Sequence, residues 1–283
     1  MKRAWLSASV IAFFLAVMIE ARSQDEPEHP QITVASDEFL KSLSSSLETL
    51  RKADFENGLE TPGLGSMSEG DFEKLVNEIR KEKPIREISE GERGVKYDVI
   101  LQPGHYGRQT GRVGTTGKWV SERALAAYIT DVLAQRLRSY GDSVLVISAD
   151  QYIHPSTKGS FDGLHSKVFL AIHLEGSEIR CRGKASIGYP KGSLPFAMHT
   201  VGLSLADALG YNYTDFAHDN FTPNEASYYM FSQVRADRLT GLLEVGELTC
   251  PEKEKQIISS SNAIGQNIAY ALNYLVKTPD TMK

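Results

Sequence analysis

From residue 95 onward the sequence alternates short apolar segments with longer amphipathic ones, and this alternation leaves few possible folds. Segments of strand length lie at 97–101 (YDVIL), 143–148 (SVLVIS), 167–173 (KVFLAIH) and 239–245 (LTGLLEV). Helical segments lie at 121–140, 203–209 and 257–276, and glycine ends the first two. Strands that are apolar throughout need cover on both faces of their sheet. We therefore expect residues 95–283 to form a three-layer α/β/α domain with a central, mostly parallel or mixed sheet.

The first 94 residues differ in composition and pattern from the rest of the sequence. Residues 1–23 have the basic start, apolar run and small-residue end of an export signal peptide, and the run is short for a membrane span of ~20 residues. Residues 24–94 comprise an acidic lead, two amphipathic helices at 36–55 and 68–83, and a charged connector. We expect a protein body outside the cytosol, with membrane contact only if the signal is uncleaved. The small α-helical segment would pack on the body or bind a regulator.

Charge and cysteine content bear on partners and compartment. The net charge of −5 argues against nucleic-acid binding, which needs a basic face. Cys181 and Cys250 are the two cysteines of the chain. In an oxidising compartment they can pair, or they can remain two small buried residues, and the sequence leaves both alternatives open.

A glycine-rich loop follows the first predicted strand, within ILQPGHYGRQTGRVGTTGKWV at 100–120. A Walker phosphate loop needs a hydroxyl residue after Gly-Lys, and Trp119 stands there instead. The glycine spacing also does not fit the Gly-x-Gly-x-x-Gly dinucleotide fingerprint. A metal site and a plain turn are the alternatives left.

Four residues favour the metal site. His105 follows the first strand and His173 ends the third, and sites in open α/β sheets form outside the carboxyl ends of strands. Glu122 lies in the first turn of the next helix, where the helix dipole favours its charge. Two imidazoles and one carboxylate are the ligand set of a catalytic zinc site, and Glu244 at another strand end is placed to act as a base. Each residue alone also has an ordinary structural role, so the hypothesis depends on their meeting at one edge.

The same positions carry a family resemblance over residues 97–276. LQPGHYG resembles a strand followed by Asp-Pro-Gly-His-Gly-Gly, and the helix within GKWVSERALAAYITDVLAQRLRSYG opens with a glutamate. VFLAIHLEG resembles a strand that ends in Ser-Ile-His, and LLEVGELTC resembles Val-Glu-Leu-Gly-Phe-Leu-Ser-Asn. In this order the motifs resemble those of the zinc-dependent N-acetylmuramoyl-L-alanine amidases of the amidase-3 type.

The resemblance implies a bacterial periplasmic or secreted enzyme of cell-wall turnover. It implies Zn²⁺ held by His105, Glu122 and His173, with Glu244 as the catalytic base. The substrate would be the amide bond between N-acetylmuramic acid and L-alanine in peptidoglycan or a muropeptide. Gln102 stands where the family has Asp, which marks a divergent member and leaves a related zinc hydrolase of another N-acyl amino acid or peptide, or a non-catalytic wall-binding module, as alternatives.

Other polar residues near these motifs are candidates for substrate contact. His218 lies in a loop that could cover a groove, Glu175 could bind a free amine, and Arg180 belongs to a basic patch that could hold carboxylates. Each is also compatible with a solvated surface position, and exposure is the expected state of Glu175. His165 precedes His173 by eight residues, and we expect a surface or structural role for it.

Overall fold

The computed structural model describes residues 67–82, 92–106, 113–148, 161, 163–191, 193, 196–211, 213 and 223–277, and six positions between 41 and 52. The chain divides into two units, Met1–Val34 and Ala35–Lys283, and all described residues belong to the second. The predicted signal peptide, the acidic lead and His218 lie outside the described residues. Within the described residues, no helix has both the length and the apolar character that a membrane crossing requires.

A five-stranded sheet in the order β2-β1-β3-β5-β4 forms the centre of the second unit. The strands β1 (Lys96–Pro103), β2 (Val144–Val146), β3 (His165–Glu175) and β5 (Arg235–Glu247) run parallel to one another. The edge strand β4 (Ser186–Gly188) pairs antiparallel with β5. The sheet is therefore mixed. The sequence did not predict β4, because a three-residue strand is too short to show a period.

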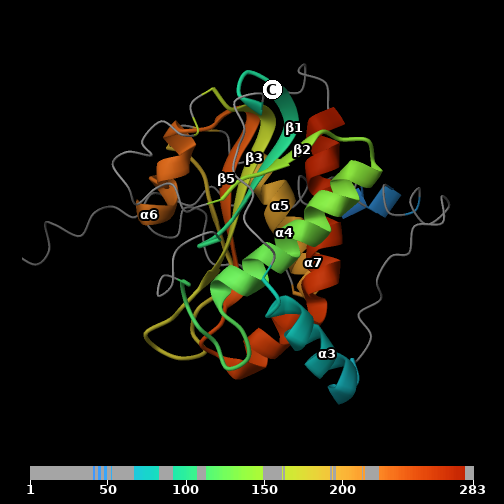
Figure 1. The fold of residues 1–283 in the computed structure, drawn as a ribbon, viewed down its shortest axis with the longest axis vertical. Helices are drawn as coiled ribbons and strands as arrows, with labels where there is room; N and C mark the ends of the chain where they lie inside the picture. Colours follow the sequence, from blue (N-terminus) through green and yellow to red (C-terminus); the bar gives the residue numbers. More distant parts are fainter. Residues whose placement is uncertain are drawn as a thin grey trace, which may run out of the picture. The chain divides into compact units, whose positions relative to one another are not determined.

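Helices cover both faces of this sheet unequally (Figure 1). The long helices α4 (Glu122–Ser139), α5 (Phe196–Leu209) and α7 (Pro251–Lys277) share one core with alternate strand residues such as Leu170 and Leu243. On the opposite face Phe169 and Leu242 pack with Met230 of the short 3-10 helix η5 (Tyr229–Ser232), and α6 (Pro223–Ala226) lies on that side. The predicted three-layer α/β/α class is confirmed, with one layer made of short turns.

The helix α3 (Glu69–Ile79), from the small helical segment predicted before the main domain, packs into the main core. The Ser68 side chain accepts a hydrogen bond from the backbone N–H of Asp71 and caps the helix. Phe72 and Ile79 are buried in the same core as α4 and α7, and the Phe72 ring packs edge-on against Trp119 at 5.3 Å. The six described positions between 41 and 52 are helical, while the apolar stripe predicted there lies outside the described residues.

One buried carboxylate attaches the loop before α4 to the start of α7. Glu254 is fully buried and accepts hydrogen bonds from the backbone N–H groups of Lys118, Trp119 and Val120, at 2.6, 2.8 and 2.9 Å. The hydrogen bond from Val120 is buried and the other two are partly buried, and a buried donor left without a partner costs about 1–3 kcal/mol. Since the loop leads directly into α4, Glu254 helps to position the first turn of that helix.

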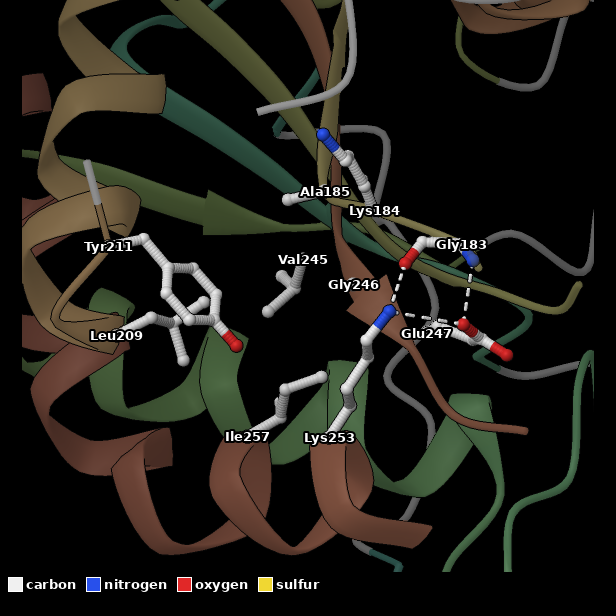
Figure 2. A pocket seen from close by; sticks show the side chains of 10 residues that line it. All are labelled: Gly183, Lys184, Ala185, Leu209, Tyr211, Val245, Gly246, Glu247, Lys253 and Ile257. Carbon is white, nitrogen blue, oxygen red and sulfur yellow. Dashed lines mark hydrogen bonds and ion pairs between the residues drawn. The ribbon is translucent and has the colours of Figure 1, made fainter. Parts of the chain in front are cut away.

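A second anchor holds the segment after β3. Cys181 and Cys250 form a disulfide, which resolves the alternatives left open by the sequence. Glu247, at the end of β5, accepts hydrogen bonds from the backbone N–H groups of Cys181 and Gly183, both at 2.7 Å. Figure 2 shows the Lys253 ammonium between the Gly183 carbonyl and the Glu247 carboxylate, beside a hollow of about 310 Å³ with mainly apolar walls. The polar groups of this anchor are thus used within the fold.

The Glu254 anchor leads to a stability prediction. The Glu254→Gln variant should lower the free energy of unfolding by about 2–4 kcal/mol, because an amide replaces charge-assisted acceptors and turns its NH₂ toward backbone donors. Urea denaturation followed by circular dichroism measures the change. Glu252→Gln is the matched control, since it removes an exposed carboxylate from the same helical turn. Equal losses in both variants would contradict the role of Glu254.

Candidate metal centre

Three donor atoms meet at the carboxyl ends of β1 and β3. Glu122 Oε1 lies 3.3 Å from His105 Nε2 and 3.0 Å from His173 Nδ1, and all three donor atoms lie within 4.8 Å of one another. The strands are parallel neighbours with Pro103 opposite Ile172, so the residues that follow reach the same edge of the sheet. The convergence predicted from the sequence is therefore present in the structure.

Glu122 is the centre of this group. Glu122 is only 3% exposed. Its two carboxylate oxygens also accept hydrogen bonds from the backbone N–H groups of Thr115 at 2.9 Å and Leu174 at 3.3 Å. Burial by itself raises the pKa of Glu122. Hydrogen bonds to His105 and His173, and the charges of these residues, outweigh burial and lower the pKa to about 2. Glu122 is therefore a carboxylate over the whole range in which proteins work.

Glycine residues let the backbone of the loop approach these side chains closely. Gly114 has a φ of +75°, and a Cβ there would overlap the Glu122 carboxylate. A Cβ on Gly104 would lie 2.6 Å from His173 Nδ1. The glycines at these two positions thus allow the backbone to pack closely on the candidate ligands. They do not form the phosphate-binding loop that the sequence analysis excluded. Residues 107–112 of the loop lie outside the described residues.

Glu244 lies beside His173 in the β3/β5 register, so both side chains point to the same face of the sheet. The residue keeps some exposed surface, but its Oε2 is buried and makes no hydrogen bond with any described residue. Burial first, and then the negative charges of Glu122, Glu225 and Glu175, raise the pKa of Glu244 well above its usual range. This carboxyl group is therefore ready to take up and hold a proton.

The donor set fits zinc. Two imidazoles and one carboxylate that leave a position open are the usual ligands of catalytic zinc. Metal bonds of about 2.0–2.1 Å in a tetrahedron separate two donor atoms by roughly 3.3 Å, close to the 3.0 and 3.3 Å found here. Glu122 and His173 are buried, whereas the His105 side chain is 21% exposed and borders the accessible side. The residues could thus hold the ion and leave room for a substrate.

The candidates for substrate contact have different surroundings. Glu175 is half-buried rather than exposed as expected, and its Oε2 has no hydrogen-bond partner among the described residues. Arg180 is exposed in the turn that follows β3. His165 lies at the other end of β3, where its Nε2 is 2.9 Å from Asp237 Oδ1, in agreement with a structural role.

The sequence analysis assigned no role in the site to three residues around His173 and Glu244, namely Gln102, Glu225 and Tyr228. The Tyr228 hydroxyl is 3.1 Å from His173 Nε2 and donates to Gln102 Oε1 at 2.8 Å. Glu225 is buried on α6, and its Oε1 accepts a hydrogen bond from the Ser186 hydroxyl at 2.6 Å. Of these, only Gln102 could have been found from the sequence, because it lies directly before Pro-Gly-His. The others lie in segments without regular periodicity, which gave no indication of their position.

No protein family and no curated protein matches the sequence. Among solved structures, the chain is similar to an N-acetylmuramoyl-L-alanine amidase from Clostridium difficile 630, with 20% identity, a TM-score of 0.49 and coverage of 65% of this chain and 99% of that chain. AmiC2 of Nostoc punctiforme, also an N-acetylmuramoyl-L-alanine amidase, is similar at 16% identity and a TM-score of 0.47, over 64% and 98% of the two chains.

The CwlD amidase from Clostridioides difficile, solved in complex with the GerS lipoprotein, is similar at 19% identity and a TM-score of 0.43, over 63% of this chain and 98% of that chain. Each of these three proteins is named as an amidase.

The low pKa of Glu122 predicts how acid affects the metal-free protein. A carboxyl group whose pKa falls from 4.5 to about 2 on folding contributes stability above pH 4.5 that is lost as the pH falls toward 2. This contribution is about 3 kcal/mol. Over that interval the free energy of unfolding should fall more steeply for the wild type than for Glu122→Gln, as measured by urea denaturation at several pH values. Parallel curves would show that Glu122 is not held as a carboxylate.

Proposed function

We propose that this protein is an exported zinc-dependent amidase that hydrolyses the amide bond between N-acetylmuramic acid and L-alanine in peptidoglycan or its fragments. The observation that carries the proposal is the group of His105, Glu122 and His173 with Glu244 in register beside it. The substrate class follows from the resemblance of the sequence motifs. This group combines a zinc ligand set with a nearby proton acceptor, which metal-assisted amide hydrolysis requires.

The side chains have separate tasks in this reaction. When bound, zinc would polarise the attacking water and the scissile carbonyl group. Glu122 would supply the negative charge that neutralises part of the ion, since its pKa of about 2 keeps it ionised. Glu244 would take a proton from the water and deliver it to the leaving amine of L-alanine. Its raised pKa suits the second step, because a weakly acidic carboxyl group holds the proton until the amine departs.

The disulfide supports the export part of the proposal. Disulfides form and persist in oxidising compartments and are rare in the cytosol, and Cys181 and Cys250 are joined. Together with the predicted signal peptide at residues 1–23, this favours a periplasmic or secreted enzyme.

The helix α3 offers a route by which a regulator could act on the site. Arg80, directly after α3, donates a hydrogen bond from Nε to the Trp119 carbonyl at 2.7 Å, and the α3 residue Phe72 packs against the Trp119 ring. Trp119 lies three residues before Glu122. A partner that moves α3 would therefore disturb the loop that positions this carboxylate.

A related zinc hydrolase of another N-acyl amino acid or peptide is the second candidate. The observation behind it is Glu175, a half-buried carboxyl group whose negative charge contributes to the raised pKa of Glu244. A substrate with a free amino group near the scissile bond would be favoured by that charge. A stem peptide with a diamino acid and an unrelated cationic peptide are both compatible with it.

The proposal predicts loss of hydrolysis on two treatments. Removal of zinc with a chelator should abolish muropeptide cleavage, and added zinc should restore it. Glu244→Gln should lower kcat about 10²–10⁴-fold while keeping one zinc per chain. For the wild type kcat/KM should rise with pH through a pKa above the usual carboxyl range, because Glu244 must be ionised to act as a base.

Mass spectrometry of the products decides between the candidates. Release of stem peptides with a free L-alanine amine supports the proposed amidase, whereas cleavage of other amides supports the second candidate. A folded protein without stoichiometric zinc would favour a non-catalytic wall-binding module. Glu178→Gln, which changes an exposed carboxylate in the turn after β3, is the control variant and should keep wild-type activity.

A further inference from the structure

A chain of hydrogen bonds leads away from the side of His173 opposite to Glu122. His173 Nδ1 faces Glu122 Oε1 at 3.0 Å, while His173 Nε2 lies 3.1 Å from the Tyr228 hydroxyl. The Tyr228 hydroxyl donates to Gln102 Oε1 at 2.8 Å, and Gln102 Nε2 donates to the Tyr229 hydroxyl at 3.2 Å. The two nitrogens of one imidazole therefore contact two different systems.

The number of protons available in this series of hydrogen bonds decides which nitrogen of His173 carries hydrogen. A tyrosine hydroxyl has a single proton, and an amide oxygen can only accept. Once the Tyr228 proton is given to Gln102 Oε1, the Tyr228 oxygen presents only lone pairs to His173. A close contact with Nε2 is then favourable only if Nε2 carries the proton, and Nδ1 is the nitrogen whose lone pair can face a metal ion.

We infer that Tyr228 and Gln102 are positioning residues for the candidate metal centre, which hold the proton of His173 on Nε2 and so keep Nδ1 available as a zinc ligand. The inference rests on the proposed function only in its use of the metal site. Metal-binding histidines commonly donate their second N–H to a protein acceptor, which orients the ring and strengthens the ligand. Here the acceptor is a tyrosine hydroxyl whose direction is set by a buried amide.

Packing keeps the chain of hydrogen bonds in place. Gln102 is fully buried on β1, and the Tyr228 ring lies edge-on to His173, with centroids 5.4 Å apart and planes at 80°. The Tyr228 ring also packs against Phe231, with centroids 5.6 Å apart. A buried polar group without a partner costs about 1–3 kcal/mol, so the hydrogen bonds and the packing favour one arrangement together.

These hydrogen bonds disfavour the alternative form of His173, in which Nδ1 carries the proton. In the absence of a metal ion, the Glu122 carboxylate attracts a proton to His173 Nδ1, and an Nδ1–H has no lone pair for zinc. If Gln102 could not accept, the Tyr228 hydroxyl would be free to donate to Nε2 and would favour that competing form. Gln102 is therefore predicted to matter for zinc affinity although it contacts neither the ion site nor His173 directly.

Two variants test the inference by zinc affinity. Tyr228→Phe removes the acceptor for Nε2–H, and Gln102→Leu frees the Tyr228 proton. Each should raise the zinc Kd about 10–100-fold, measured by competition with a chromophoric chelator. Tyr140→Phe is the matched control, since its hydroxyl accepts from Arg136 at the end of α4, and it should bind zinc as the wild type does. Thermal unfolding of the zinc-free proteins identifies variants that have lost the fold.

Nitrogen-15 NMR of histidine-labelled protein reads the proton directly. The His173 signals are assigned by their absence in His173→Asn and by their shift in Tyr228→Phe. In the zinc-loaded wild type, His173 should carry hydrogen on Nε2 and none on Nδ1. At a pH where the ring is neutral, zinc-free Gln102→Leu should carry a larger share of its hydrogen on Nδ1 than the zinc-free wild type does.

Several results would overturn the inference. These are a zinc-loaded wild type with hydrogen on Nδ1, a Gln102→Leu variant that binds zinc as the wild type does, or a control variant that loses as much affinity as the other two. Neither measurement uses hydrolysis. A protein that meets these expectations but leaves muropeptides intact would retain the positioning role and lose the proposed amidase function.

Discussion

The burial of one carboxylate, that of Glu122, is the constraint on which the site depends. A charge in the protein interior is stable only when hydrogen bonds and opposite charges replace its water. Two histidines and two backbone N–H groups do this here, and they come from the loop before α4, the end of β1 and the end of β3. The ends of these elements therefore have to meet at one point.

The position of Glu122 in turn depends on contacts that are remote in sequence. Glu254 binds three backbone N–H groups of the loop before α4, and α3 packs against Trp119 from the other side. At the far edge of the sheet, the disulfide and Glu247 hold the segment that follows β3. Two buried acidic residues of the C-terminal half thus act as acceptors for backbone donors, and they organise the loops of the site without taking part in its chemistry.

The environment divides the two central carboxyl groups into different roles. Histidine partners lower the pKa of Glu122, whereas burial and neighbouring carboxylates raise the pKa of Glu244. A pair of acids whose pKa values are pushed apart in this way can supply a permanent charge and a mobile proton in one site. The tyrosine and amide next to His173 add a third level of control, because they decide which nitrogen of the imidazole is free.

The sequence by itself determined the α/β class, the order of the main strands and helices, and the four residues that the site brings together. It could do so because buried parallel strands are apolar throughout, and because parallel strands end at a common edge where polar side chains meet. The tertiary structure decided which surroundings these residues have. The short strand β4, the joining of Cys181 to Cys250, and the contacts of Glu254 and Tyr228 bring together segments far apart in the chain. Local periodicity carries no information about such contacts, since they depend on how the packed elements approach one another.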